Sequence, residues 1–343
     1  MSLACLSSDR LAAGFTKAQW CAPWCRATSK ASHCRLCPCQ RCAFCMPPPP
    51  ACDEQDDQWG NTRYFLAIVS VFKNEADVIR EWVEHHLWQG VEHFFLVDNG
   101  STDKWREALG ERMPHVSVAR NETLYSQVSH LNSWLSRLQA EVRWVLSIDV
   151  DEYVYAHPSR GSESIDAYLR HVEQADCKAR KISLAWHQFG SSGYVQQPPS
   201  VRRFFTRSAA NASLGFGGKY VVRTSAVQQL RVHDAVRIQG QQREWWMNRI
   251  SPPLVLNHYS IMSRDRFVQV KMTRGDVAAV KLLGTRTLTY FERYDKMGDE
   301  IDNLDLKMLL ERACSSSLRA KTRGGVASCV APASAMSSRA SFR

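Results

Sequence analysis

An apolar run near the middle of the chain ends abruptly in three acids, Asp149, Asp151 and Glu152. Leu146 and Ile148 are typical of the end of a buried strand, and open α/β sheets bind ligands at the carboxyl edge of their strands. Alternate residues of an extended backbone point to the same side, so Asp149 and Asp151 can converge on one cation. Carboxylates suit Mg²⁺ or Mn²⁺, which commonly complete their coordination with substrate phosphates. The motif predicts a divalent-cation site, against the alternative of a solvated acidic turn.

Two further polar clusters each follow an apolar strand. Lys73-Asn74-Glu75 follows the β-branched run 64–72, and Asp98-Asn-Gly-Ser-Thr-Asp103 follows the run 94–97. The carboxyl ends of parallel strands lie along one edge of a sheet, so loops distant in sequence can build one site there. Each cluster alone has the composition of a turn or a helix start. Three in succession, spaced as αβ units, predict one shared binding site.

Strands alternate with helices through much of the chain, which predicts βαβ units. The strands expected from apolar runs cover 64–72, 94–97, 115–119, 143–148, 180–186, 218–223 and 254–258. The helices expected from helical spacing cover 75–89, 125–140, 163–174 and 264–274. The sequence therefore predicts an α/β fold, Rossmann-like, with a mostly parallel sheet flanked by helices in a single main domain over residues 63–312.

The two ends of the chain differ from this body in composition. Residues 1–60 hold nine of the 12 cysteines, a run of prolines and an acidic stretch. Cys34-x-x-Cys37, Cys39-x-x-Cys42 and Cys42-x-x-Cys45 have the spacing of zinc ligands. Because such spacings overlap and little apolar sequence surrounds them, a disordered leader is expected instead of a zinc knuckle. The composition of residues 313–343 predicts a disordered basic tail. Because few cysteines lie in the body of the protein, a core stapled by disulfides is not expected.

The net charge of +10 does not indicate a nucleic-acid partner. The tail alone contributes five basic residues and no acids, and no dense Lys/Arg run is interleaved with aromatic residues. No apolar stretch approaches the roughly 18 residues that span a bilayer, and no export signal is recognisable. No nucleic-acid partner is therefore expected, and the chain shows no membrane anchor.

The motifs also occur in a distinctive order. The first half carries Phe72-Lys-Asn-Glu-Ala76, Glu81-Trp-Val-Glu-His-His86, Gly90-Val91, Phe94 to Asp103, and Asp149-Val-Asp-Glu-Tyr153. The second half carries Trp186-His-Gln-Phe-Gly190, Gly218-Lys219, His233, Asn257-His-Tyr259, Lys271 and Arg274-Gly-Asp276. Over roughly residues 63–280 this order resembles glycosyltransferase family 92 and related family-2-like transferases.

The resemblance implies a GT-A fold with a nucleotide-binding half at 63–155 and an acceptor half at 156–312. It also implies a nucleotide-sugar donor, commonly UDP-galactose in this family, a glycan or other hydroxyl acceptor, and a place in the Golgi or secretory pathway. Three asparagines match the glycosylation sequon, but such triplets are common by chance and say little about compartment.

Roles for single residues also follow from the resemblance. Glu75, Asp98 and Asp103 would contact the nucleoside, with Lys73 and Asn74 shaping the loop. Asp149 and Asp151 would hold Mn²⁺ or Mg²⁺ and the diphosphate.

A late histidine ligand is implied as well. His258 fits this role better than His233, although a core histidine bonded to a neighbouring carbonyl is an equally good interpretation. Lys219 and Arg274, with Lys271 and Arg223, would neutralise the leaving diphosphate, although for each one alone a solvated basic residue is the better interpretation.

The expected mechanism is direct displacement at the anomeric carbon with inversion, in which a carboxylate deprotonates the acceptor hydroxyl. Asp234, Glu244, Asp265 and Asp276 all qualify as this base, and Asp234, beside a histidine, is chosen. An Asp151→Asn variant would fold normally, because neighbouring acids at a strand end repel each other.

Two other functions remain open at this stage. A nucleotidyltransferase also combines paired carboxylates with a nucleotide in an α/β fold, but it usually has a Gly-rich basic loop after its first strand, where this chain has no glycine. A zinc-knuckle binding protein with a degenerate transferase body is the non-enzymatic alternative.

Overall fold

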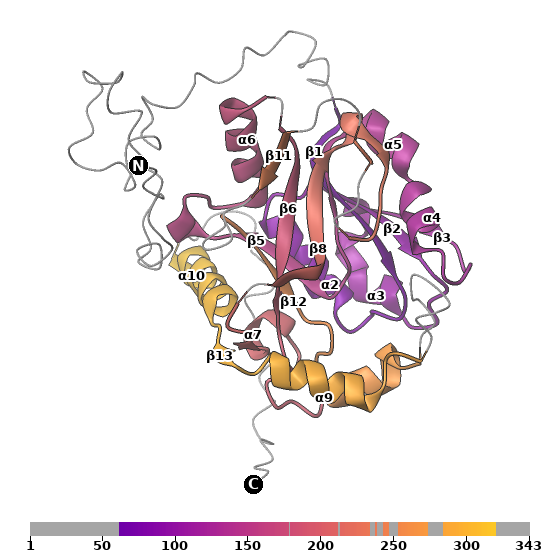
Figure 1. Cartoon of the computed structure of the whole chain (residues 1–343), viewed down its shortest axis with the longest axis vertical. Helices are drawn as coiled ribbons and strands as arrows, with labels where there is room; N and C mark the ends of the chain where they lie inside the picture. Colours follow the sequence, from indigo (N-terminus) through magenta and orange to yellow (C-terminus); the bar gives the residue numbers. More distant parts are fainter. Residues whose placement is uncertain are drawn as a thin grey trace, which may run out of the picture.

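A large mixed sheet forms the centre of the protein (Figure 1). The computed structural model describes residues 62–319 except 178, 212, 234–236, 239–242, 247–252 and 274–283. Within this part the sheet has the strand order β3-β2-β1-β4-β8-β6-β12-β5, with β11 beside β6. Its strands are β1 (Tyr64–Phe72), β2 (His93–Asp98), β3 (Val116–Arg120), β4 (Val142–Ser147), β5 (Glu152–Ala156), β6 (Ala179–Gln188), β8 (Ser213–Arg223), β11 (Arg243–Trp246) and β12 (Leu254–His258).

Helices cover both faces of the sheet. They are α2 (Ile79–Trp88), α3 (Trp105–Leu109), α4 (Gln127–Asn132), α5 (Leu135–Glu141), α6 (Ile165–Ala175), α7 (Val201–Phe204), α8 (Arg264–Arg266), α9 (Leu288–Met297) and α10 (Asp305–Arg319). The 3₁₀ turns are η6 (Gly110–His115), η7 (Pro158–Arg160) and η8 (Thr224–Ala226), and η9 (Phe267–Lys271) is π-helical. Two small ladders pair β9 (Val227–Gln229) with β10 (Arg237–Ile238), and β7 (Arg207–Ser208) with β13 (Ile301–Asp302).

Alternation along β1 divides the apolar core between the two faces. Leu66 and Ile68 pack in a cluster with side chains of α2, α3 and α6, whereas Ala67 and Val69 pack with side chains of α4 and α5. This follows from the two-residue period of a strand, which makes a strand covered on both sides apolar throughout. The continuous apolar run that predicted β1 is therefore a buried central strand.

The topology brings the polar clusters that follow β1, β2 and β4 to one edge of the sheet. Strands β3, β2, β1 and β4 are mutually parallel in the order of one half of a doubly wound sheet. Beyond them β8 runs antiparallel to both β4 and β6, while β12 is parallel to β6 and antiparallel to β5. The predicted fold class, a GT-A α/β sheet flanked by helices in one main domain, is confirmed.

The expected strands and helices are present, but β5, β11, α3, α7, α9 and α10 were not expected, and β8 begins at Ser213, five residues earlier than expected. Three further differences concern helices. The single helix expected over 125–140 is two helices, α4 and α5. The helix expected from Arg264 becomes π-helical at Phe267. The basic tail was expected to be irregular from residue 313, but α10 continues to Arg319 with Leu306 and Leu310 buried, so its start was placed too early.

Cysteine chemistry also differs from the expectation. Cys177 and Cys314, the two cysteines in the described part, are both disulfide-bonded. Disulfide bonding therefore involves the body of the protein, although few cysteines lie there. The proposed zinc ligands at Cys34 to Cys45 lie outside the described residues. No helix in the described part is long and apolar enough to cross a membrane.

Two buried histidines join α2 to β5. The His86 Nδ1 atom lies 2.8 Å from the carbonyl oxygen of Trp82, and the His86 Nε2 atom accepts a hydrogen bond from the Val154 amide at 3.3 Å. The neighbouring His85 ring bonds the Val154 carbonyl. Burial lowers the pKa of His86 to about 3, and protonation would also remove the acceptor for Val154.

We expect these contacts to make the fold sensitive to mild acid. The folded pKa of His86 lies below the unfolded value, so its contribution to stability is complete above about pH 6.5 and is lost as the pH falls toward 3. Between pH 7 and 5 this single group should lower the free energy of unfolding by about 2 kcal/mol. Urea unfolding at pH 7 and pH 5 should show a smaller difference in the free energy of unfolding for His86→Gln than for the wild type. An identical difference in the two proteins would contradict the assignment.

Candidate functional site

Asp149, the first acid of the motif, is held by a lysine from the neighbouring strand. Its Oδ2 atom accepts a hydrogen bond from Lys219 Nζ at 2.7 Å, and its Oδ1 atom accepts one from Gln127 Nε2 at 3.0 Å. Lys219 is buried on β8, beside the end of β4. Burial opposes its charged form, but Asp149 and Glu152 outweigh that effect and raise its pKa. Lys219, which was predicted to neutralise the leaving diphosphate, therefore lies against the acidic motif.

Asp151, the second acid, is paired with a different lysine. Its Oδ2 atom accepts a hydrogen bond from Lys271 Nζ at 2.5 Å, and both side chains are buried. Its Oδ1 atom faces His258 Nε2 at 3.8 Å. Each acid thus has its own cationic partner, so the two do not repel each other as the sequence alone suggested. The expectation that Asp151→Asn leaves folding unaffected loses its basis, because Lys271 would be left without its carboxylate.

Glu152 connects these two acids to the rest of the site. It accepts hydrogen bonds from the Asp149 amide at 2.7 Å and from Trp186 Nε1 at 2.6 Å, and Lys219 Nζ lies 3.5 Å away. Its side chain is fully buried, and this burial raises its pKa to about 8, partly countered by Lys219. Sequence reasoning gave Glu152 no role beyond the acidic run, because only the fold shows that it points inward.

His258 lies at the end of β12, directly opposite Glu152 on β5. Its ring centroid is 4.4 Å from that of Trp186, and burial lowers its pKa to about 4. The imidazole is therefore neutral near pH 7, the form in which histidine binds metals. Its rival His233 also contacts Trp186, with ring centroids 5.4 Å apart.

The Asp151 and His258 pair fits a divalent cation. Two metal–ligand bonds of about 2.1 Å span up to about 4.2 Å, so an ion can lie between atoms 3.8 Å apart. Within the residues that the structure describes, no group of three or more His, Cys, Asp or Glu side chains is arranged to hold a metal ion. The assignment of Asp149, Asp151 and His258 to Mn²⁺ or Mg²⁺ therefore stays a prediction.

The loops after β1 and β2 are tied together by their own polar side chains. The backbone amide of Asn74 donates a hydrogen bond to Ser101 Oγ at 3.0 Å, and the side-chain Oδ1 of Asn74 accepts one from the backbone amide of Thr102 at 2.8 Å. Asp103 Oδ2 accepts from the Ala76 amide at 2.7 Å. Asn74 has a φ of +54°, a conformation that asparagine tolerates better than most residues. The predicted site residues Asn74 and Asp103 therefore shape this edge of the sheet.

Two of the predicted nucleoside contacts are buried carboxylates that pair with arginines. Asp98 is fully buried, accepts from the Ser101 amide at 2.7 Å and pairs with Arg120 at 2.8 Å. Glu75 is also buried and pairs with Arg266, which bonds Asp77 as well. Lys73 is partly buried beside the Asn74 turn.

The segment 263–271 links two of the polar loops. Arg266 binds the loop after β1 through Glu75, and Lys271 binds the loop after β4 through Asp151. Sequence reasoning missed Arg266, and no spacing signal distinguishes it from Arg264. Both ion pairs join residues more than a hundred positions apart, which a linear pattern does not show.

The catalytic base stays a prediction. Asp234, Arg274 and Asp276 lie outside the described residues. Asp265 is described, at α8, where its amide donates to the Val195 carbonyl at 2.9 Å.

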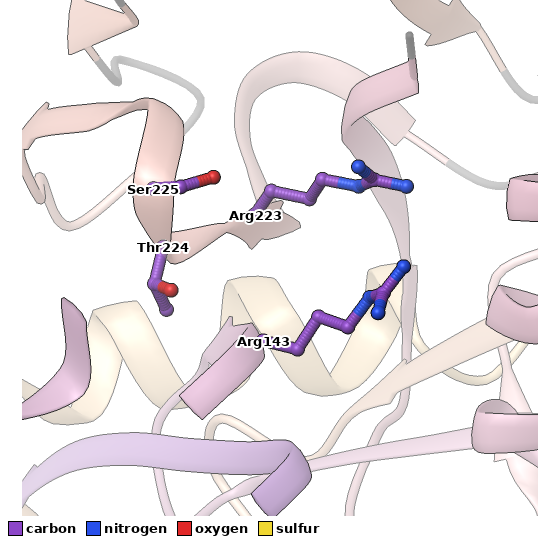
Figure 2. Close-up of a pocket in the computed structure, with 4 residues that line it drawn as sticks. All are labelled: Arg143, Arg223, Thr224 and Ser225. Atoms are coloured by element: carbon purple, nitrogen blue, oxygen red, sulfur yellow. The ribbon is translucent and has the colours of Figure 1, made fainter. Parts of the chain in front are cut away.

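Arg223 lies at the opposite end of the sheet from the acidic motif. It is four residues along β8 from Lys219, about 13 Å of extended chain. There Arg223 and Arg143 both pair with Glu173 Oε1, at 3.0 and 2.7 Å. Figure 2 shows the side chains of Arg143 and Arg223 extending in the same direction. Together with Thr224 and Ser225 they line a small pocket. The expectation that Arg223 neutralises a diphosphate at the acidic motif is wrong, because it is directed toward α6.

A protein-family model matches more than half of the chain. The model of the family described as Glycosyltransferase family 92 matches residues 66–288. The chain therefore belongs to glycosyltransferase family 92.

Curated relatives are plant members of the same family. The chain is 26% identical to a glycosyltransferase family 92 protein of Arabidopsis thaliana over 222 residues, which is 62% of this chain and 38% of that protein. It is 27% identical to one from Ricinus communis over 144 residues, which is 40% of this chain and 25% of that protein. The chain thus spans well under half the length of these relatives.

Solved structures show a more distant likeness. S. aureus TarS 1–349 is similar over 47% of this chain and 48% of its own, with a TM-score of 0.31 and 16% identity, and it has also been crystallised with UDP. A mycobacterial protein is similar over 52% of this chain and 59% of its own, with a TM-score of 0.31 and 12% identity.

The Glu173 network should stabilise the fold without contributing to ligand binding. Glu173→Gln keeps the side-chain shape but removes the negative charge between Arg143 and Arg223, so we expect a loss of about 1–3 kcal/mol in the free energy of unfolding. Urea unfolding measures the loss, and titration with UDP should give the wild-type affinity. Unchanged stability, or UDP affinity reduced tenfold or more, would contradict this separation.

Proposed function

We propose that this chain transfers a sugar, with galactose as the first candidate, from a UDP-sugar to a hydroxyl group of a glycan or glycoconjugate, with the help of Mn²⁺ or Mg²⁺. The observation that carries the proposal is the pair of Asp151 and neutral His258, 3.8 Å apart at the carboxyl edge of the sheet. Family membership supports a sugar-nucleotide donor over the nucleotide substrates of a nucleotidyltransferase.

The cations of the site would bind the donor diphosphate. Lys219 and Lys271 already lie against the two acids of the motif, each with a buried ammonium group. A buried ammonium attracts a phosphate strongly, because little water screens the interaction. Arg274 is a further candidate for the same role.

The nucleoside would lie against the loops after β1 and β2. Asn74 and Asp103 are partly buried at this edge, whereas Glu75 and Asp98 are each paired with an arginine. Glu75 and Asp98 would therefore act by holding the loops in place, and Lys73, Asn74 and Asp103 would be the nearer contacts.

A divalent cation would be held by Asp151 and His258, with Asp149 and Lys219 adjusting the charge beside it. When bound, the cation supplies electrostatic stabilisation of the leaving diphosphate. Glu152 would position both Lys219 and Trp186, since its two carboxylate oxygens contact them.

Transfer would proceed by direct displacement with inversion. A carboxylate of the acceptor half would remove the proton of the attacking hydroxyl. Asp234 remains the first candidate for this base, followed by Glu244, Asp265 and Asp276.

The Asp151→Asn variant tests the role of the acidic motif. The substitution keeps the shape of the side chain and removes the charge that would hold the cation, so transfer should slow by about 10²–10³-fold. Sugar transfer and UDP release are measured with UDP-galactose and other UDP-sugars in Mn²⁺. Because Lys271 loses its carboxylate, circular dichroism must first show that the variant is folded.

Glu173→Gln is the matched control, since it removes one carboxylate at the far end of the sheet. It should keep wild-type transfer rates wherever it is folded. Full activity of Asp151→Asn, or wild-type transfer undiminished by exhaustive chelation, would refute the cation-dependent mechanism.

A further inference from the structure

Lys271 forms an ion pair with Asp151, one of the proposed ligands of the cation. Its side chain is only 3% exposed, and its Nζ atom lies 2.5 Å from Asp151 Oδ2. The other oxygen of the same carboxylate faces His258. One buried carboxylate therefore serves both a lysine and the candidate cation position.

Two ion pairs at the motif balance their charges, and the buried carboxyl group of Glu152 also lies 3.5 Å from Lys219. Asp149 is matched by Lys219 and Asp151 by Lys271, so these four groups together carry no net charge. A divalent cation arriving alone would add two positive charges beside a buried ammonium. A diphosphate arriving alone would add negative charge beside two carboxylates. Both events are costly where little water screens the charges, whereas their joint arrival adds opposite charges that offset each other.

The backbone that carries Lys271 is fixed independently of Asp151. Arg266, five residues earlier, holds this segment to Glu75 and Asp77. Phe267 is fully buried and packs with Phe291 of α9. Because lysine has a flexible four-carbon stem, its ammonium can change partner while its backbone stays in place.

We propose that Lys271 is a positioning residue that couples cation binding to donor binding, by neutralising Asp151 in the donor-free protein and moving to the donor diphosphate when a cation takes Asp151. This inference rests on the proposed function, and it deepens that function by specifying how the two ligands depend on each other. Any site with two protein ligands gains some coupling when a phosphate completes the metal shell. The contribution of Lys271 can be told apart from this general coupling, because removing the lysine should strengthen the binding of the cation when no donor is present.

Coupling between two ligands is reciprocal, so it can be measured from either side. We expect UDP to tighten Mn²⁺ binding to the wild-type protein by roughly 10–100-fold, within the usual range of such couplings. The probes are Mn²⁺ alone, UDP alone, and each in the presence of the other, followed by titration calorimetry and by electron paramagnetic resonance of free Mn²⁺.

Lys271→Met keeps much of the stem and removes the ammonium. This variant should bind Mn²⁺ alone several-fold more tightly than the wild type, bind UDP alone more weakly, and show a coupling reduced at least fivefold. Lys271→Arg keeps the positive charge and should keep most of the coupling. Lys296→Met removes a charge from an exposed lysine of α9 and should match the wild type in all four affinities.

The outcomes separate the coupling from the proposed function. A wild-type protein that binds UDP and Mn²⁺ independently overturns the coupling even if no variant folds. Weaker Mn²⁺ binding by folded Lys271→Met, or unchanged coupling in it, overturns the role of Lys271. A wild-type protein that binds neither ligand overturns the proposed function as well.

Discussion

Acids gathered at the carboxyl edge of a parallel sheet must be neutralised when no ligand is bound, and the second half of this chain supplies three of the cations that do so. Lys219 pairs with Asp149, Lys271 with Asp151, and Arg266 with Glu75. An unpaired buried charge costs several kcal/mol, so these pairs stabilise the contact between the two halves of the chain. They also keep three cationic groups at the edge of the sheet where the donor would bind. The same contacts thus serve both folding and the proposed chemistry.

The antiparallel strand β8 makes this arrangement possible. It lies between β4 and β6, antiparallel to both, and places Lys219 beside the carboxyl end of β4. A parallel strand at this position would instead end here and continue into a loop. Strand β12 then pairs with β5, so that His258 lies opposite Glu152 and near Asp151. Trp186 contacts both His258 and Glu152, which fixes the spacing between these strands.

Local pattern was enough to predict the acidic motif and seven of the nine strands of the sheet, but not β5 or β11. The apolar runs of β1 and β12 matched their strands residue for residue, because both strands are covered on both faces. The partners of the acids were harder to predict. Arg266 gave no signal, and Lys271 was grouped with Arg223, whose position along β8 puts it at the other end of the sheet. Side-chain partners depend on strand register and on which strands are neighbours, and neither can be read from the spacing of residues along the chain.

The central claim concerns where a cation binds and what it displaces. The most direct measurement is a crystal structure with UDP and Mn²⁺, with diffraction recorded at the manganese absorption edge to locate the metal. The account predicts one anomalous peak between Asp151 and His258, in contact with the diphosphate, with Lys271 Nζ on a phosphate oxygen. UDP bound at this edge with Lys271 still paired to Asp151, or manganese bound elsewhere in the protein, would contradict it.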